Sequence, residues 1–209
     1  MSNLRLSGGE NFISSAEIAS RTEELGRYYT DLYAGEPLVI IGLLRGAARF
    51  AVHLAESIDN PDIYEDFMRT KKMNGAHSLG KVSVLSDPDV LSNPDIDITD
   101  MNFLVVEDID DTRETLSVVL PLLAQHNPKR LDLVSLFNKP TVPKFVDELP
   151  CDDIQYGFDI ENVFVVGHGL DWKGRYRALA HASAAHNIAE AGEPEFWVPI
   201  VPNELKIAA

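Results

Sequence analysis

An acidic segment directly follows a short apolar run near the middle of the chain. The run is Phe103-Leu104-Val105-Val106, and the segment holds four acids in five positions together with two threonines: Glu107, Asp108, Asp110, Asp111, Thr112 and Thr115. Carboxylates can hold sugar hydroxyls, bind Mg²⁺ or accept a proton, and threonine hydroxyls at a helix start can hold a phosphate. The segment therefore has the groups needed to bind a phosphorylated sugar and to do acid–base chemistry.

The pattern of apolar residues predicts the elements that must position this segment. A short, continuously apolar run at 38–41 is typical of a parallel strand buried on both faces, and 103–106 is a second clear buried strand. Two further strands are predicted at 131–137 and 163–167. Helical patterns cover 14–35, where Ser14 and Glu17 form a capping box, as well as 48–57 and a stretch from about Thr115 to Ala124. We expect an α/β fold with a mainly parallel sheet flanked by helices, and ligands beyond the carboxyl ends of the strands.

The length of 209 residues fits one domain with small additions. We expect a single domain over residues 1–187. Within it, the polar, turn-rich residues 60–99 are predicted to form a β-rich hood with a mobile loop, and Val82 to Leu85 is the one plausible strand there. Residues 188–209 are predicted to be a C-terminal extension that docks on the body or on a neighbouring subunit.

The charge balance excludes some partners. The chain has 33 acids and 18 bases, a formal net charge of −15, which argues against nucleic acid and against an anionic membrane surface. Cys151 is the single cysteine, the N-terminus lacks the apolar stretch of a signal peptide, and no apolar run has the length of a membrane span. We therefore expect a cytoplasmic protein.

Four motifs in matching order resemble the type I phosphoribosyltransferases, specifically the hypoxanthine-guanine branch. Residues 103–116 (FLVVEDIDDTRETL) resemble that family's signature for 5-phosphoribosyl-1-pyrophosphate, and residues 39–47 (VIIGLLRGA) resemble its pyrophosphate loop. Residues 136–140 (LFNKP) and 164–172 (FVVGHGLDW) are similar to its two purine-binding stretches. The resemblance implies a Mg²⁺-dependent transfer of the phosphoribosyl group to a 6-oxopurine, with release of pyrophosphate and a role in purine salvage.

The resemblance also implies roles for the acidic segment. Glu107 and Asp108 would hold the ribose hydroxyls, directly or through Mg²⁺, and Asp111 would be the general base that faces the purine N7. The main chain of the next residues would cradle the 5′-phosphate, with help from the two threonine hydroxyls: Thr112, Arg113, Glu114 and Thr115.

Further roles implied by the resemblance lie outside this segment. A non-proline cis peptide at Arg45-Gly46 would meet pyrophosphate near a subunit interface, in a homodimer or a dimer of dimers. Lys139 would donate to the purine 6-oxo group. The other implied contacts are stacking by Phe164, main-chain recognition of the base edge by Val165, a second metal at Asp171 and a pyrophosphate contact from Arg177.

The sequence departs from the family pattern at three places. Arg113 stands where the family has glycine or another small residue, so its side chain either obstructs the phosphate loop or adds a phosphate contact. Asp110 stands where an apolar residue is usual. The family's serine-tyrosine lid is replaced by a segment that contains Thr70-Lys71-Lys72.

Two other functions remain open from the sequence. Residues 108–112 (DIDDT) also match the nucleophile motif of haloacid-dehalogenase-like phosphatases, with Asp108 as nucleophile and Asp110 as acid/base. That motif usually lies close to the N-terminus, and the phosphatase hypothesis leaves the stretch from Phe164 to Asp171 unexplained. The third hypothesis is a ligand sensor without turnover, which the altered lid favours and the retained Asp111 and Lys139 oppose.

Overall fold

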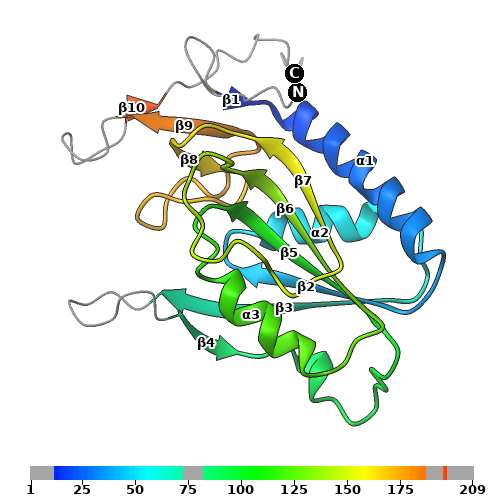
Figure 1. Cartoon of the computed structure of the whole chain (residues 1–209). Helices are drawn as coiled ribbons and strands as arrows, with labels where there is room; N and C mark the ends of the chain where they lie inside the picture. The colour runs from blue at the N-terminus through cyan, green and yellow to red at the C-terminus, as the bar shows by residue number, and fades with distance from the viewer. Residues whose placement is uncertain (1–11, 73–81, 187–194, 197–209) are drawn as a thin grey trace, which may run out of the picture.

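The computed structural model of the chain describes residues 12–72, 82–186 and 195–196 (Figure 1). Its main sheet has six strands in the order β4-β3-β2-β5-β6-β7, and all pairs are parallel except β3 with β4. The strands are β2 (Leu38–Leu44), β3 (Ile63–Lys72), β4 (Val82–Ser86), β5 (Asn102–Asp110), β6 (Arg130–Asn138) and β7 (Asp153–Asp159). The predicted mainly parallel sheet is confirmed.

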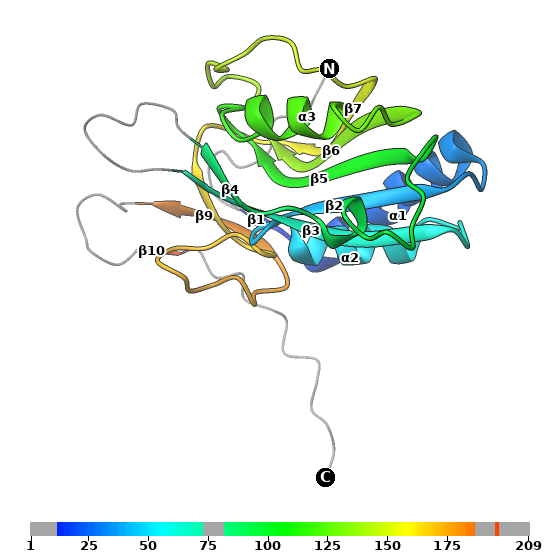
Figure 2. The ribbon, with the colours of Figure 1, turned by 90° about the horizontal axis from the view of Figure 1, so that it is seen from below.

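Helices cover both faces of this sheet. Helices α1 (Ser15–Tyr33) and α2 (Ala48–Ser57) lie on one face and α3 (Leu116–Ala124) lies on the other, as Figure 2 shows. Alternate residues of β2 and β5 enter two separate cores, so that Ile40 packs on the side of α1 and α2 while Ile41 packs on the side of α3. This two-sided burial is the reason that these strands are continuously apolar. None of the described helices is long and apolar enough to span a membrane.

The capping box predicted at the start of α1 is present. The main-chain N–H of Glu17 donates to the Ser14 hydroxyl at 3.2 Å, and the Ser14 N–H donates to the Glu17 carboxylate at 3.0 Å. The helix ends at Tyr33, and Ala34 follows with φ of 49°, a left-handed C-cap conformation. Both ends of the longest helix are therefore determined by local sequence.

A small antiparallel sheet agrees with the expected β-rich hood, but strands other than those of residues 60–99 build it. Strand β9 (Ala182–His186) pairs with β1 (Phe12–Ile13), β8 (Phe164–Gly167) and β10 (Glu195–Phe196), beyond the end of the main sheet where β5 and β6 finish (Figure 1). Residues 60–99 were predicted to build the hood, but β3 and β4 extend the main sheet instead. The prediction failed because β3 is largely polar, and its place beside β2 is set by main-chain pairing along seven registered positions rather than by an apolar pattern.

The altered lid segment is only partly described. Thr70, Lys71 and Lys72 end strand β3, where they pair with β4. The remainder of the predicted mobile loop, and all of the predicted C-terminal extension except the two residues of β10, lie outside the described residues. A short 3₁₀ helix (Asp89–Leu91) and an irregular segment connect β4 to β5.

Candidate active site

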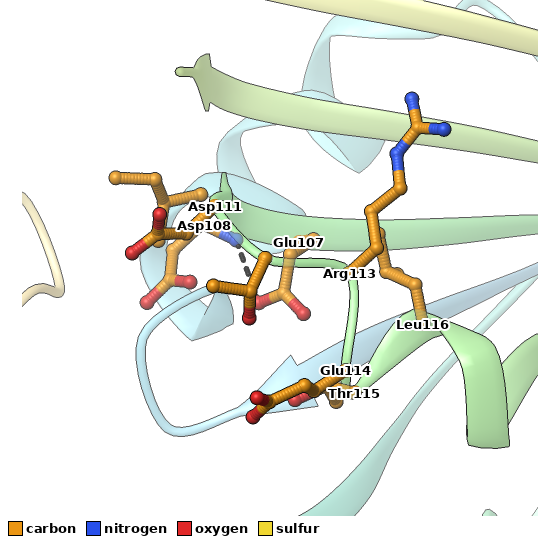
Figure 3. A pocket seen from close by; sticks show the side chains of 9 residues that line it. Glu107, Asp108, Asp111, Arg113, Glu114, Thr115 and Leu116 are labelled. Atoms are coloured by element: carbon orange, nitrogen blue, oxygen red, sulfur yellow. Dashed lines mark hydrogen bonds between the residues drawn. The ribbon is translucent and has the colours of Figure 1, made fainter. Parts of the chain in front are cut away.

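Strand β5 carries the acidic segment to one edge of the main sheet. Its first six residues are buried, and Glu107 is only 8% exposed. The main-chain N–H of Asp108 donates to the Glu107 carboxylate at 3.0 Å (Figure 3). The buried apolar residues thus hold two adjacent carboxylates in fixed positions at the carboxyl end of a central strand, as the sequence predicted.

A cavity of about 180 Å³ lies between the end of β5 and the start of α3 (Figure 3). Helix α3 begins at Leu116, directly after Thr115 as predicted, so residues 111–115 form a loop that wraps the cavity. The Thr115 hydroxyl makes no capping bond to the helix. A helix N-terminus that is not capped by its own side chain favours an anion. The cavity is lined by Glu107, Asp108, Ile109, Asp111, Thr112, Arg113, Glu114, Thr115 and Leu116.

The two carboxylates at the cavity are held in an environment that disfavours their charge. Burial raises the pKa of Glu107 well above its usual value, and the charge of Asp108 raises that pKa further. Burial also raises the pKa of Asp108, although hydrogen bonds and the charge of Arg177 offset part of this shift. A cation, or hydroxyl groups that donate hydrogen bonds, would relieve this cost.

The loop after β2 packs directly on this pair. A β-carbon at Gly46 would overlap the Asp108 carboxylate, and a β-carbon at Gly169 would overlap the Gly46 carbonyl. Gly169 also has φ of 104°, which glycine adopts without strain. These two glycines therefore bring three distant segments together: the loop after β2, the end of β5 and the turn after β8.

The cis peptide of the β2 loop is displaced by one residue from its predicted position. It joins Leu44 to Arg45, whereas the sequence-based assignment placed it at Arg45-Gly46. The close approach of Asp108 requires a glycine at position 46. Arg45 itself is exposed.

Asp111 and Lys139 meet at the edge of the cavity. Lys139 directly follows β6, and its Nζ lies 3.4 Å from Oδ2 of Asp111. The Lys139 side chain is 8% exposed, whereas that of Asp111 is 40% exposed. The main-chain N–H of Lys139 also donates to the Asp110 carbonyl at 3.1 Å. The parallel pairing of β5 with β6 thus brings a donor and an acceptor to one place, with the acceptor open to solvent.

An exposed aromatic residue begins strand β8. Phe164 is 41% exposed, and its ring packs edge-on against that of Trp172 with 5.5 Å between centroids. The Lys173 ammonium lies 5.2 Å from the Trp172 ring. The next residue, Val165, is buried at 4% exposure and pairs with β9. An exposed ring held by a second aromatic ring can stack on a planar ligand.

Asp171 and Arg177 bind each other. Arg177 Nη2 lies 2.6 Å from Oδ1 of Asp171, and the Gly174 N–H donates to Oδ2 at 2.6 Å. Arg177 also donates to the Gly169 carbonyl at 2.6 Å. Within the described residues, no group of three or more potential metal ligands is formed. Both Asp171 carboxylate oxygens thus have protein partners, and the second metal that the resemblance places at Asp171 stays a prediction.

Asp110 and Arg113 are paired and do not face the cavity with their charged groups. The Asp110 side chain is fully buried, and its Oδ2 accepts from Arg113 Nε at 3.2 Å. Figure 3 shows the Arg113 guanidinium directed away from the carboxylates of Glu107 and Asp108. The guanidinium is instead bound to Asp110, the Asp147 carbonyl and the Tyr156 hydroxyl.

Comparison with known families agrees with this geometry. The sequence model of the family described as "Phosphoribosyl transferase domain" matches residues 14–172, which span α1, the cavity and the aromatic pair. The chain belongs to the phosphoribosyl transferase family. The resemblance noted from the four motifs is confirmed.

Similar members of the family carry closely related names. The hypoxanthine phosphoribosyltransferase of Salmonella typhimurium is 37% identical over 175 residues, with 82% of this chain and 92% of that protein covered. The hypoxanthine-guanine phosphoribosyltransferase of Sus scrofa is 34% identical over 193 residues, covering 88% and 83%. The crystal structure of a hypoxanthine phosphoribosyltransferase from Staphylococcus aureus has a TM-score of 0.73 at 32% identity, covering 84% and 90%.

A Mg²⁺ ion fits part of this phosphoribosyl transferase site. Glu107 and Asp108 offer oxygen ligands, which Mg²⁺ prefers, and burial raises both of their pKa values, a cost that a cation would relieve. Mg²⁺ usually binds one or two carboxylates and completes its shell with water and substrate phosphates. The two carboxylates satisfy that requirement without Asp171.

The geometry opposes the phosphatase alternative. That hypothesis needs Asp110 as an acid/base beside Asp108, but the Asp110 side chain is fully buried between Arg113 and Lys144. Asp110 is also absent from the residues that line the cavity. The phosphoribosyl transferase family therefore accounts for the acidic segment, and the phosphatase motif is a coincidence of spacing.

Three residues near the site were missed by the sequence analysis. Trp172 was quoted in a motif but given no role, although an aromatic residue beside Asp171 was a visible signal. Lys144 and Tyr156 contact Asp110 from a loop and from an edge strand, with Nζ 3.2 Å from Oδ1 and the hydroxyl 2.8 Å from Oδ2. These two are separated from Asp110 by 34 and 46 positions, and no sequence pattern links them to it.

Proposed function

We propose that this protein transfers the 5-phosphoribosyl group from 5-phosphoribosyl-1-pyrophosphate to a 6-oxopurine of the hypoxanthine and guanine type, a reaction of purine salvage. The observation that carries the proposal is the pair of Lys139 and Asp111, 3.4 Å apart at the edge of the cavity. A 6-oxopurine presents O6 and N7 side by side on one edge. One ammonium and one carboxylate at this spacing match a carbonyl acceptor beside a ring N–H.

The purine would lie between the pair and the exposed ring of Phe164. Lys139 donates a hydrogen bond to O6, and Phe164 stacks on the base with Trp172 behind it. The Val165 main chain contacts the opposite edge of the base. This arrangement orients the purine so that its N9 points at the sugar in the cavity, which supplies the proximity on which bimolecular reactions depend.

The phosphoribosyl donor, 5-phosphoribosyl-1-pyrophosphate, would occupy the cavity with its 5′-phosphate in the 111–115 loop. The main-chain N–H groups of this loop and the Thr112 and Thr115 hydroxyls hold the phosphate. Glu107 and Asp108 accept hydrogen bonds from the ribose hydroxyls. Arg45, Gly46 and Arg177 lie on the side where pyrophosphate leaves. Bound Mg²⁺ would neutralise charge on pyrophosphate and so make it a better leaving group.

The chemical step forms one bond and breaks one. Purine N9 attacks the anomeric carbon as the bond from that carbon to the pyrophosphate oxygen breaks, and pyrophosphate leaves with the electron pair. Asp111 accepts the proton from N7, so that the purine remains neutral in the product. Positive charge develops on the ribose ring in the transition state, and the carboxylates of Glu107 and Asp108 stabilise it.

The test is pyrophosphate release with Mg²⁺, 5-phosphoribosyl-1-pyrophosphate and a panel of hypoxanthine, guanine, xanthine, adenine and uracil. We expect release that depends on hypoxanthine or guanine and that stops with excess chelator. Assays without a base provide the control. Donor binding by calorimetry without turnover on any base would contradict the proposal and favour the ligand sensor instead.

We further infer that the protein acts as a homodimer or a dimer of dimers in the cytoplasm. The resemblance to the family supports the assembly, and the exposed position of Arg45 leaves room for an interface beside the loop after β2. Light scattering coupled to gel filtration measures the mass in solution. A single peak at the mass of one chain would contradict the inferred assembly.

A further inference from the structure

Two successive residues of the loop after β6 donate hydrogen bonds to three successive main-chain carbonyls, at the end of β5 and in the 111–115 loop. The Lys144 ammonium donates to the main-chain carbonyls of Asp110 and Asp111, both at 2.8 Å. The main-chain N–H of Phe145 donates to the carbonyl of Thr112 at 2.7 Å. We call Lys144 and Phe145 the carbonyl brace.

The brace determines which way the peptide units of the loop face. In a trans peptide the N–H points away from the C=O of the same unit. When the carbonyls of Asp111 and Thr112 point to the brace, the N–H groups of Thr112 and Arg113 point to the opposite side. The cavity is lined by these same residues. This orientation presents main-chain N–H donors to an anion in the cavity.

Arg113 strengthens the same arrangement from within the loop. Its φ is 62°, a conformation that residues with a β-carbon seldom adopt. Its guanidinium binds the Asp147 carbonyl at 2.6 Å and the Tyr156 hydroxyl at 3.2 Å, in addition to Asp110. These contacts tie the unusual backbone conformation to the segment that contains the brace.

A buried carboxylate holds the two cations together. Asp110 is 0% exposed, and it accepts from Lys144, Arg113 and the Tyr156 hydroxyl at 3.2, 3.2 and 2.8 Å. A buried charge persists only when it is paired and hydrogen-bonded, and here two cations and a hydroxyl meet that need. The Lys144 side chain is 14% exposed, so it is held in place rather than free in solvent.

We propose that Lys144 is a positioning residue for the donor phosphate. It does not touch the substrate. Through the carbonyls of Asp110 and Asp111 it fixes the direction of the loop N–H groups, and Asp110 in turn fixes Lys144 and Arg113. The identity of the bound anion as the 5′-phosphate of 5-phosphoribosyl-1-pyrophosphate rests on the proposed function, whereas the geometry of the brace does not.

The first experiment compares Lys144→Met with Lys129→Met in steady-state kinetics. Lys129 is a matched control because its ammonium pairs with Glu36 at 2.6 Å, outside the cavity lining, and both side chains are about half exposed. We expect Lys144→Met to raise KM for the donor at least tenfold, the order expected when hydrogen bonds to a charged group are lost. KM for the purine should stay within about twofold, and Lys144→Arg should recover most of the donor affinity.

A second variant separates the contacts of the Arg113 guanidinium from the unusual backbone conformation at this position. Glycine adopts φ of 62° freely, so Arg113→Gly keeps the loop conformation accessible while it removes the guanidinium contacts. We expect this variant also to raise KM for the donor. The proposal would be overturned if both single variants, Arg113→Gly and Lys144→Met, had the kinetics of the wild type. It would also be overturned if KM for the donor and KM for the purine rose equally.

Hydrogen exchange tests the brace without relying on turnover. We expect the amides of residues 111–115 to exchange faster in Lys144→Met than in the wild type, while the amides of β2 are unchanged. Equal exchange in the two proteins would contradict the brace even if the wild type were inactive. An inactive wild type with faster exchange in the variant would remove the proposed function and leave the brace intact. If Lys144→Met does not fold, Lys144→Ala, which also removes the N–H donor, takes its place in each measurement.

Discussion

The ammonium of Lys139 lies 3.4 Å from a carboxylate oxygen of Asp111, although 28 positions separate the two residues. Parallel pairing of β5 with β6 brings them together, because both residues lie immediately beyond the carboxyl end of their strand. The pair joins a donor for a carbonyl oxygen to an acceptor for a ring proton. This relationship is the basis of the first two predictions.

Asp111→Asn should lower kcat about 100-fold or more, because an amide cannot accept the N7 proton in the transition state. The substitution keeps the shape of the side chain, so donor binding measured by calorimetry should be close to that of the wild type. Near-normal turnover would remove Asp111 from the mechanism.

Lys139→Ala should raise KM for the purine by about 10-fold or more, the loss expected for a hydrogen bond from a charged donor. KM for 5-phosphoribosyl-1-pyrophosphate should change far less, because Lys139 lies outside the residues that line the phosphate cavity. Lys129→Ala, which removes an exposed lysine, is the control. Equal weakening of both substrates would contradict the proposed contact with O6.

Gly46→Ala should lower kcat/KM by about 10-fold or more, since the added methyl overlaps the Asp108 carboxylate and must displace it. Gly35→Ala is a useful comparison, because a β-carbon there meets nothing within 4 Å and only the backbone at φ of 79° is affected. We expect Gly35→Ala to lower the melting temperature and leave kinetics unchanged. Unaltered kinetics in Gly46→Ala would show that Asp108 does not need its present position.

Stability should fall in acid because of His168. This side chain is 4% exposed, and burial lowers its pKa to about 4, so the folded protein keeps it neutral. Below pH 6.5 the unfolded chain binds a proton at this histidine, whereas the folded protein does so only below about pH 4. The stabilising contribution is therefore fully present above pH 6.5 and is lost as the pH falls from there through 4. The loss is at most about 3 kcal/mol, from 1.36 kcal/mol per pKa unit.

The variant His168→Asn isolates this contribution. Asparagine tolerates the φ of 46° at this position and cannot titrate. Urea unfolding at pH 7, 5.5 and 4.5 should show a smaller decline in the free energy of unfolding for the variant than for the wild type. Parallel declines in the two proteins would mean that His168 is not responsible.

Elements with a strong local pattern were predictable from the sequence. The helix at 48–57 and the strands that became β2, β5 and β6 were located because residues buried on both faces must be continuously apolar. The start of α1 was located because a capping box is a contact between residues three positions apart. The motifs around Glu107, Lys139 and Phe164 were also recognisable, since each is a short continuous stretch.

Elements that depend on distant partners were not predictable. Strand β7 was missed because it lies at the sheet edge, where all of its residues are half-buried and an apolar run is not required. Strand β3 was misassigned to the hood because its largely polar sequence has no apolar pattern that indicates pairing with β2. The cis peptide lies one residue before its predicted position. The contact of Gly46 with Asp108 could not be predicted, because the two residues are distant in sequence.

The sequence by itself determined that an acidic loop follows a buried strand, and it predicted a phosphate, a sugar and a metal as the ligands of that loop. It left open whether Arg113 faces the ligand, and it carried no sign that Lys144 matters. Only the tertiary structure decided these points. A buried charge such as Asp110 takes its partners from whichever segments the fold brings within hydrogen-bonding distance, and that choice is a property of packing rather than of local sequence.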